Sequence, residues 1–490
     1  MPFAYQAGIT LPAEDAPARG RALRLAAWLV PFAVLGAALV RLYPDSYQQD
    51  GGFHFLFARW SLEHPRLLVD VWGRPLFTAL YAVPARYGYP VAKLLTLVMA
   101  LAAAWNTAQL ARAHGLERSE LAAPLLFLQP SFLLVCSDTM TEPLFALLLA
   151  VALRFHQAGR IRSGMWMAAL LPLARPEGFF VALLWGAAVA FDARAGRTFL
   201  WRVLSTVQLA GGVALWWAAA TLLTRDPEFI LHNWPPNWAA GATYGTGPLL
   251  QYWLIRDQLL AGPILQALFA LGLVVLVASR RALLPVATLV LVAGLHSVFF
   301  RVGLFGSAGY ARYLVCVAPP MALAMLAGWN LLAGWAHRLP RLVQRGAGAA
   351  ALLWAGWLCL GYLDSYGSSR DARAVDDMVA WFEAHPRPVK RLVFSQAYMS
   401  IRFDRDPAER PRLGTDTEEN VEILRASPPG TLIFWDAHTG PQYRHVGPAD
   451  FERAGYERLH AASYDLEPLL PHRPALAPYG QEMVMYYKAR

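Results

Sequence analysis

Long apolar segments recur along this chain and are separated by short loops that carry arginine, proline and glycine. A helix needs about 20 mainly apolar residues to cross a hydrocarbon core of about 30 Å, and windows of this kind predict about eleven spans. They lie near residues 22–41, 89–111, 119–136, 141–156, 163–174, 177–191, 202–223, 257–279, 283–300, 313–335 and 348–366. The pattern predicts an α-helical polytopic membrane protein. Residues 1–21 form a cytoplasmic N-terminal segment, and residues 22–366 form the transmembrane domain.

The pattern changes sharply after residue 366, where polar residues become frequent. The segments "RLVFSQAY", "TLIFWDAH" and "EMVMYYK" are typical of short strands, and "DARAVDDMVAWFEAH" and "PADFERAGYERL" are typical of amphipathic helices. Residues 367–490 are therefore predicted to form a small soluble α/β domain of about the common domain size.

The first external loop, residues 43–88, is predicted to begin with a short amphipathic helix. Its apolar positions follow the i, i+3, i+4, i+7 spacing of one helical face. These positions are Phe53, Leu56, Phe57 and Trp60. The polar residues that lie off this stripe are Asp50, His54, Arg59 and Glu63. Such a helix is expected to lie flat at the membrane interface with its polar side toward water.

The arginines predict the orientation, because short loops that carry positive charge stay on the cytoplasmic side. Every second loop is basic, beginning with the segment that precedes the first span. The N-terminus is therefore predicted to be cytoplasmic, and the first loop and the C-terminal domain to be extracytoplasmic. The expected location is the inner (plasma) membrane of a bacterium, with the lipid bilayer as a partner.

Composition supports this prediction, because the 490 residues are 56% hydrophobic and only 16% charged. The net charge of +9 is mainly the topology signal, and no basic face of a soluble module indicates nucleic-acid binding. The three cysteines, Cys136, Cys316 and Cys359, lie in apolar segments and have no disulfide or metal-site spacing. No cofactor or metal site is predicted, although a divalent metal is not excluded.

Asp50, in the stretch "QQDGGFHF", is the main candidate for chemistry. The two glycines that follow it allow a sharp turn and close approach of a ligand, and the positive end of a helix favours its carboxylate. Its reference pKa of about 3.9 leaves it ionised at neutral pH, so it is suited to act as a general base. The alternative is that Asp50 only caps a surface helix.

Arg301 and Arg312 lie in the external connection between the ninth and tenth predicted spans. Arginines there run against the usual charge asymmetry, so both are candidates for binding a phosphate. Alternatively, each extends to the lipid headgroups from a helix end.

Further candidates lie at the external ends of other spans. Asp138 and Glu142 are expected on one helix face, where they can bind a sugar, and Thr139 and Glu142 also fit a capping box. Arg175 and Glu177 flank a turn near the hydrocarbon boundary, where an unpaired charge is costly, so they pair with each other or contact a phosphate.

His54 and Arg74 accompany Asp50 in the first loop as candidate substrate contacts. A single histidine is more often only a hydrogen-bonding surface residue, and by itself it makes no metal site.

The chain resembles the GT-C superfamily of integral-membrane glycosyltransferases. The resemblance rests on one N-terminal span followed by the early acidic residue, "GFHFLFARWSLEHP" and "DVWGRPLFTALYAVP", and then on "QPSFLLVCSDTMTEPLFALLLAVALRF" and "LLPLARPEGFF". It covers about residues 20–335 and is closest to bacterial enzymes that take mannose or another sugar from a polyprenyl-phosphate carrier. Many members carry two adjacent acidic residues in the first loop, whereas this chain has Asp50 and Gly51.

The resemblance implies an inverting glycosyltransferase with Asp50 as the base, a polyprenyl-phosphate-linked sugar as donor, and a glycan, lipid or protein as acceptor. Such a reaction needs a base for the acceptor hydroxyl and cationic groups for the leaving phosphate. The rival hypothesis is a non-enzymatic flippase or transporter of lipid-linked sugars, for which polar residues are expected at several mid-span positions.

Overall fold

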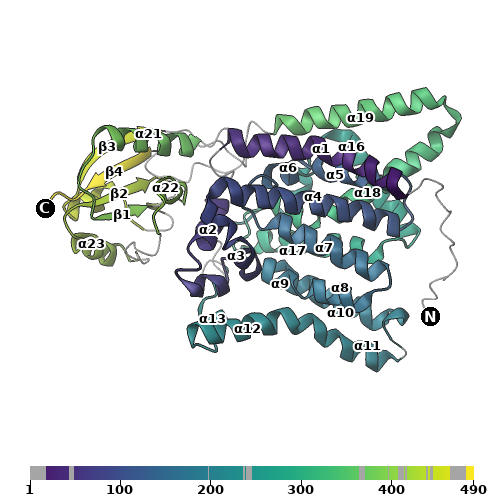
Figure 1. Ribbon diagram of the computed structural model, residues 1–490, viewed down its shortest axis with the longest axis horizontal. Helices are drawn as coiled ribbons and strands as arrows, with labels where there is room; N and C mark the ends of the chain where they lie inside the picture. Colours follow the sequence, from purple (N-terminus) through teal and green to yellow (C-terminus); the bar gives the residue numbers. More distant parts are fainter. Residues whose placement is uncertain are drawn as a thin grey trace.

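Figure 1 shows a computed structural model of the chain. Its first half forms the helices of the first loop and of the early spans. The structure describes residues 18–43, 49–196, 198–235, 238, 245–362, 370–394, 397–406, 413, 416–437, 440–441, 445–463 and 482–490. The helices up to residue 191 are α1 (Ala18–Leu42), α2 (Gln49–Arg59), α3 (Pro75–Tyr81), α4 (Tyr89–Ala113), α5 (Ala122–Phe127), α6 (Pro130–Val135), α7 (Glu142–Gln157), α8 (Ile161–Ala168), α9 (Leu171–Ala174) and α10 (Glu177–Phe191).

The remaining helices of the membrane domain follow the predicted spans, except for the short α13 and α14, which lie between the spans predicted at 202–223 and 257–279. They are α11 (Phe199–Ser205), α12 (Gly211–Thr224), α13 (Phe229–His232), α14 (Gln251–Leu254), α15 (Arg256–Leu259), α16 (Gly262–Ala278), α17 (Leu283–Val302), the 3-10 segment η7 (Ala311–Val317), α18 (Ala318–Trp335) and α19 (Arg341–Gly361). Each predicted span therefore contains helix within the described residues. The predicted boundary at 366 lies outside them.

Five helical segments are long and apolar enough to cross a membrane by themselves, counted over the part of the chain that the structure describes. They are Gly20–Leu42, Tyr89–Ala113, Phe199–Thr224, Leu283–Val302 and Ala311–Arg338. Shorter apolar helices are Ile161–Ala174, Glu177–Phe191 and Gly262–Ala278. The protein is a polytopic α-helical membrane protein, as the hydropathy pattern predicts.

The predicted span 119–136 is not one helix but two, α5 and α6, with a break at Leu128 and Gln129. Pro130 opens α6 and cannot donate a backbone hydrogen bond, so the helical ladder is interrupted there. The Gln129 side chain donates to the carbonyl of Ala318 over 3.0 Å. Broken helices are tolerated at membrane depth where protein surrounds them, and residues 122–146 are all buried.

Close helix packing in the membrane domain depends on glycine where α16 crosses α18. A Cβ atom on Gly272 would lie 1.6 Å from the carbonyl oxygen of Ala324, and one on Gly328 would lie 2.0 Å from that of Leu268. Small residues let helix backbones approach closely in a bilayer, where packing provides much of the association energy.

The C-terminal domain contains the predicted sheet and lies at one end of the helical bundle (Figure 1). Its strands β1 (Arg391–Phe394), β2 (Thr431–Asp436), β3 (Glu457–Ser463) and β4 (Glu482–Tyr487) have the order β1-β2-β4-β3. The β1 and β2 pair is parallel, and β4 runs antiparallel to both β2 and β3. The helices are α21 (Arg370–Ala384), α22 (Ala397–Arg402), α23 (Thr417–Arg425) and α25 (Pro448–Arg453).

Two apolar layers cover the sheet. Leu432 and Phe434 of β2 pack with residues of α21 and α22, whereas Ile433 and Trp435 pack with residues of α23 and α25. This explains why β2 is buried throughout and apolar from Leu432 to Trp435 instead of alternating. Two details differ from the sequence expectation: "RLVFSQAY" continues into helix α22, and "PADFERAGYERL" ends as a helix at Arg453 before β3 begins.

Candidate active site

Asp50 lies in the first turn of α2, as predicted. Its carboxylate forms an ion pair with the Arg312 guanidinium of η7, and the two residues are 262 positions apart in the chain. The Asp50 side chain is 42% exposed, whereas that of Arg312 is 7% exposed. An accessible carboxylate is thus held against a buried cation.

Gly51 is required where the first turn of α2 meets the turn before α7. A Cβ atom on Gly51 would lie 2.5 Å from Oδ2 of Asp138, so any side chain would collide with that carboxylate. The Thr139 hydroxyl donates to the Gly51 carbonyl over 2.6 Å. Asp138 itself is buried and accepts hydrogen bonds from the Tyr89 hydroxyl and from the Thr139 backbone, both at 2.7 Å. The glycine therefore allows close approach of protein to α2.

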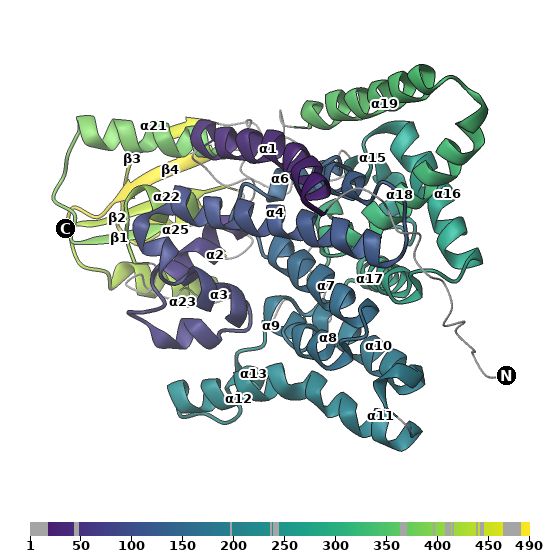
Figure 2. The same cartoon turned by 45° about the vertical axis from the view of Figure 1, so that its right-hand side comes forward.

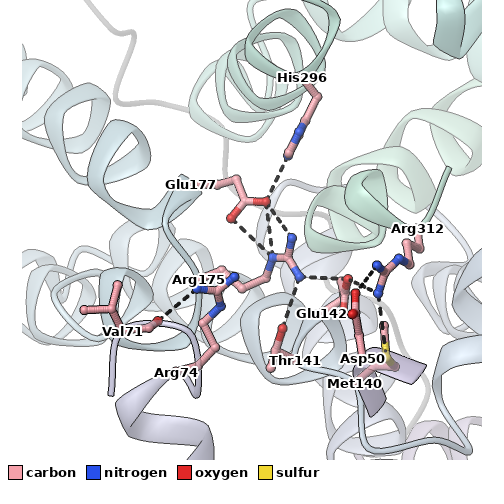
Figure 3. Close-up of polar contacts among 10 residues, drawn as sticks. All are labelled: Asp50, Val71, Arg74, Met140, Thr141, Glu142, Arg175, Glu177, His296 and Arg312. Atoms are coloured by element: carbon pink, nitrogen blue, oxygen red, sulfur yellow. Dashed lines mark hydrogen bonds and ion pairs between the residues drawn. The ribbon is translucent and has the colours of Figure 1, made fainter. Parts of the chain in front are cut away.

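A buried network of alternating charges extends from Asp50 (Figure 3). Glu142 Oε1 lies 3.8 Å from Arg312 Nη1 and 2.7 Å from Arg175 Nη1. Arg175 also donates to Glu177 Oε1 over 2.8 Å, and Glu177 Oε1 lies 2.9 Å from His296 Nε2. Carboxylates and guanidinium groups alternate, so no buried charge in the network faces only like charge.

Arg312 has donor capacity beyond its pair with Asp50. Its Nη1 is 3.8 Å from the sulfur of Met140, a weak acceptor, and its Nε has no hydrogen-bond partner among the described residues. The guanidinium lies 5.4 Å from the ring centres of Tyr310 and Tyr313. Such a group can bind a phosphate after a small movement.

Arg74, from the first loop, is a further cation near Asp50 and Arg175. It has a left-handed backbone with φ of 60°, and its Nη1 donates to the Val71 carbonyl over 3.0 Å. Burial, with the nearby Arg175 charge, lowers the pKa of Arg74 to about 10. The guanidinium stays protonated at neutral pH and adds to the positive potential there.

The pKa values of Asp50 and His54 reflect this setting. Burial opposes ionisation of Asp50, but the Arg312 guanidinium outweighs it and holds the pKa of Asp50 below its ordinary value. Burial and then the Arg74 charge hold the pKa of His54 well below its ordinary value. His54 is therefore neutral at physiological pH.

His54 does not face water, contrary to the expectation for an interfacial helix. It is 5% exposed and stacks on Trp72, with ring centres 4.6 Å apart. His54 is buried because α2 packs between α3 and α22 of the C-terminal domain (Figure 2).

The expected capping box and shared helix face are also wrong. α7 begins at Glu142, and Asp138 lies in the turn before it. The Thr139 hydroxyl is bound to Gly51, and the Glu142 carboxylate pairs with Arg175, so neither caps the helix. Stronger tertiary partners replace the local ones.

The structure gathers most of the predicted residues. Those connected through the charge network are Asp50, Glu142, Arg175, Glu177 and Arg312. Arg301, in contrast, is exposed near the end of α17 and has no ion pair with any described residue.

Two polar residues of the membrane domain were not singled out from the sequence. His296 is 6% exposed and stacks on Tyr313 with ring centres 4.9 Å apart. Lys93 is fully buried in α4, and its Nζ donates to the Tyr43 carbonyl over 3.0 Å. The usable signal is the presence of an ionisable group inside an apolar segment.

Within the described residues, no three His, Cys, Asp or Glu side chains form a group that could hold a metal ion.

The chain is similar in fold to two solved structures of ArnT. The solved structure of ArnT from Cupriavidus metallidurans in the apo state has a TM-score of 0.60 and 14% identity, covering 83% of this chain and 93% of ArnT. ArnT from the same organism bound to undecaprenyl phosphate has a TM-score of 0.62 and 13% identity, covering 96% of this chain and 98% of ArnT. At this identity the likeness establishes the fold.

Arabinofuranosyltransferase AftD from Mycobacteria is also similar, with a TM-score of 0.43 and 14% identity over 94% of this chain and 41% of AftD, which is too low to support a conclusion. No family model matches the sequence, and no curated protein matches it.

Proposed function

We propose that this protein is a GT-C-type glycosyltransferase that moves a sugar from a polyprenyl-phosphate carrier to an acceptor hydroxyl at the extracytoplasmic face of the membrane. The ArnT fold supports the proposal, since one of the two ArnT structures is bound to undecaprenyl phosphate. The observation that carries it is the accessible Asp50 carboxylate paired with Arg312.

The proposed step needs little acid catalysis, because a phosphate is already a good leaving group. Asp50 takes the proton of the acceptor hydroxyl, and the resulting oxygen attacks the anomeric carbon. The bond from that carbon to the phosphate oxygen breaks on the opposite face, which inverts the anomeric configuration. The carrier leaves as polyprenyl phosphate, and the proton stays on Asp50 until solvent removes it.

The cations provide the electrostatic part of the reaction. Arg312, Arg175 and Arg74 are placed to attract the phosphate, and charge-assisted bonds to arginine stabilise the charge that grows on the leaving group. Glu142 and Glu177 hold Arg175, so they act by positioning a guanidinium. Asp138 is also a positioning residue, because its carboxylate packs against Gly51 in the first turn of α2.

The test is sugar transfer in proteoliposomes with radiolabelled polyprenyl-phosphate mannose and other polyprenyl-phosphate sugars as probes. Asp50→Asn should lower the rate of polyprenyl-phosphate release by about 10²- to 10⁴-fold, the usual contribution of a general base. The matched control is Asp226→Asn, because Asp226 lies in a loop where it pairs with the exposed His232.

Near-normal turnover of Asp50→Asn would remove the central assignment. Movement of the intact donor across the bilayer without cleavage would instead favour a flippase.

A further inference from the structure

The C-terminal domain contacts α2, the helix that contains Asp50, directly through α22 (Figure 2). A Cβ atom on Gly52 would lie 3.0 Å from Cβ of Ala397 and 3.4 Å from Cδ1 of Ile401. Ala397 is 1% exposed and belongs to the apolar core of the membrane domain, although it lies in the C-terminal part of the chain. Residue 52 is therefore at a tight contact between the two domains.

Two polar pairs lie beside this apolar contact. Arg59, at the end of α2, lies 3.5 Å from Asp404, and His64 pairs with Asp406. Asp404 is 73% exposed, whereas Asp406 is 11% exposed. The arrangement has the buried centre and polar rim of a specific interface.

The first turn of α2 is consequently held from two sides. Gly51 meets Asp138 and Thr139 of the membrane domain, and Gly52 meets Ala397 and Ile401 of the C-terminal domain. Asp50 immediately precedes both glycines. Any shift of α22 is transmitted to the residue that carries the carboxylate.

We propose that the C-terminal domain positions the general base: α22, through Ala397 and Ile401, fixes the first turn of α2 and so sets the direction of the Asp50 carboxylate. This inference rests on the proposed function. Ala397, Ile401 and Gly52 are positioning residues, since they act only through Asp50.

The test exchanges a methyl group across the contact. Gly52→Ala adds a Cβ atom where Ala397 already fills the space, and Ala397→Gly removes the facing one, so the double variant keeps one methyl group between the helices. Gly52→Ala should lower kcat about tenfold with little change in donor KM, because a misplacement of about 1 Å can cost about a hundredfold. The double variant should recover to within about threefold of the parent, the sign of direct coupling.

A second measurement separates positioning from a general loss of structure. Gly52→Ala should move the acid limb of the kcat/KM profile to higher pH, because Asp50 loses part of its contact with Arg312. The control is Glu457→Gln, whose exposed pair with Arg387 lies within the C-terminal domain and should not affect activity.

Full activity in both single variants, with Asp50→Asn inactive, would overturn the positioning inference and leave the proposed function intact. A loss in Gly52→Ala that Ala397→Gly does not reverse, with an unmoved acid limb, would also overturn it. An active Asp50→Asn would instead overturn the proposed function.

Discussion

Asp50 is restrained by the same arginine that is proposed to bind the phosphate. In the free protein the Arg312 guanidinium lowers the pKa of Asp50, and a more acidic group is a weaker base. When a phosphate takes part of the hydrogen bonding of Arg312, the carboxylate becomes more basic. On the proposed function, donor binding would therefore raise the basicity of Asp50 before the acceptor reacts.

This exchange predicts two different pH profiles. A general base works when ionised, so activity falls as pH drops through the pKa of Asp50. The acid limb of kcat/KM, which reports the free protein, should lie at lower pH than the acid limb of kcat, which reports the complex. Arg312→Gln should move the kcat/KM limb to higher pH, because the cation that lowers the pKa is lost.

Arg225→Gln is the control for this measurement, since Arg225 is exposed at the end of α12. Coincident acid limbs in the parent protein would contradict the exchange of Arg312 between Asp50 and phosphate.

Short elements, more than long spans, build the site. α2, α7, the turn before α10, the first residue of α10 and η7 each contribute one charged side chain to the network. Pro176 lies at the N-cap of α10, between Arg175 and Glu177 of the network. Because the network is buried, its stability depends on every charge keeping its partner.

Glu142 gives the clearest test of the network, since its carboxylate lies between Arg175 and Arg312 and is fully buried. Glu142→Gln should lower the free energy of unfolding by at least about 3 kcal/mol, because removing one partner leaves buried charge uncompensated. Thermal unfolding in detergent measures the change.

Glu120→Gln provides the comparison, because Glu120 pairs with a half-exposed Arg24 and such surface pairs contribute about 1 kcal/mol or less. Equal melting temperatures of the Glu142→Gln and Glu120→Gln variants would show that the buried network does not stabilise the fold.

The whole molecule combines a membrane-spanning helical bundle and a C-terminal α/β domain that packs on α2 of the first loop. If the arginine pattern gives the orientation correctly, the C-terminal domain and Asp50 are extracytoplasmic and the N-terminus is cytoplasmic. The three native cysteines are buried, so they are not expected to react with a labelling reagent.

Labelling in intact cells tests this topology. Asp377→Cys, at a side chain that is 60% exposed in the C-terminal domain, should react with a membrane-impermeant maleimide. Arg118→Cys, in a predicted cytoplasmic loop, should react only after the membrane is opened. The reverse pattern would place the site in the cytoplasm.

Much of the fold could be predicted from local sequence. The spans, the short helix α2 and three of the four described strands follow from hydropathy and periodicity, because these depend on neighbouring residues. β3 was missed because "ERLHAAS" is only partly buried and lacks a clear alternation. The capping box was wrong because Glu142 has a stronger tertiary partner than the backbone of its own helix.

Hydropathy and helical periodicity indicate a polytopic helical protein with a carboxylate near the start of a short helix, because both are properties of contiguous residues. The pairing of Asp50 with Arg312 instead of Arg301, and the contacts of Gly51 and Gly52 with two different surfaces, arise from the folded arrangement. Those contacts join residues far apart in the chain, so packing selects them. The energy of an ion pair depends on distance and burial, which local sequence does not specify.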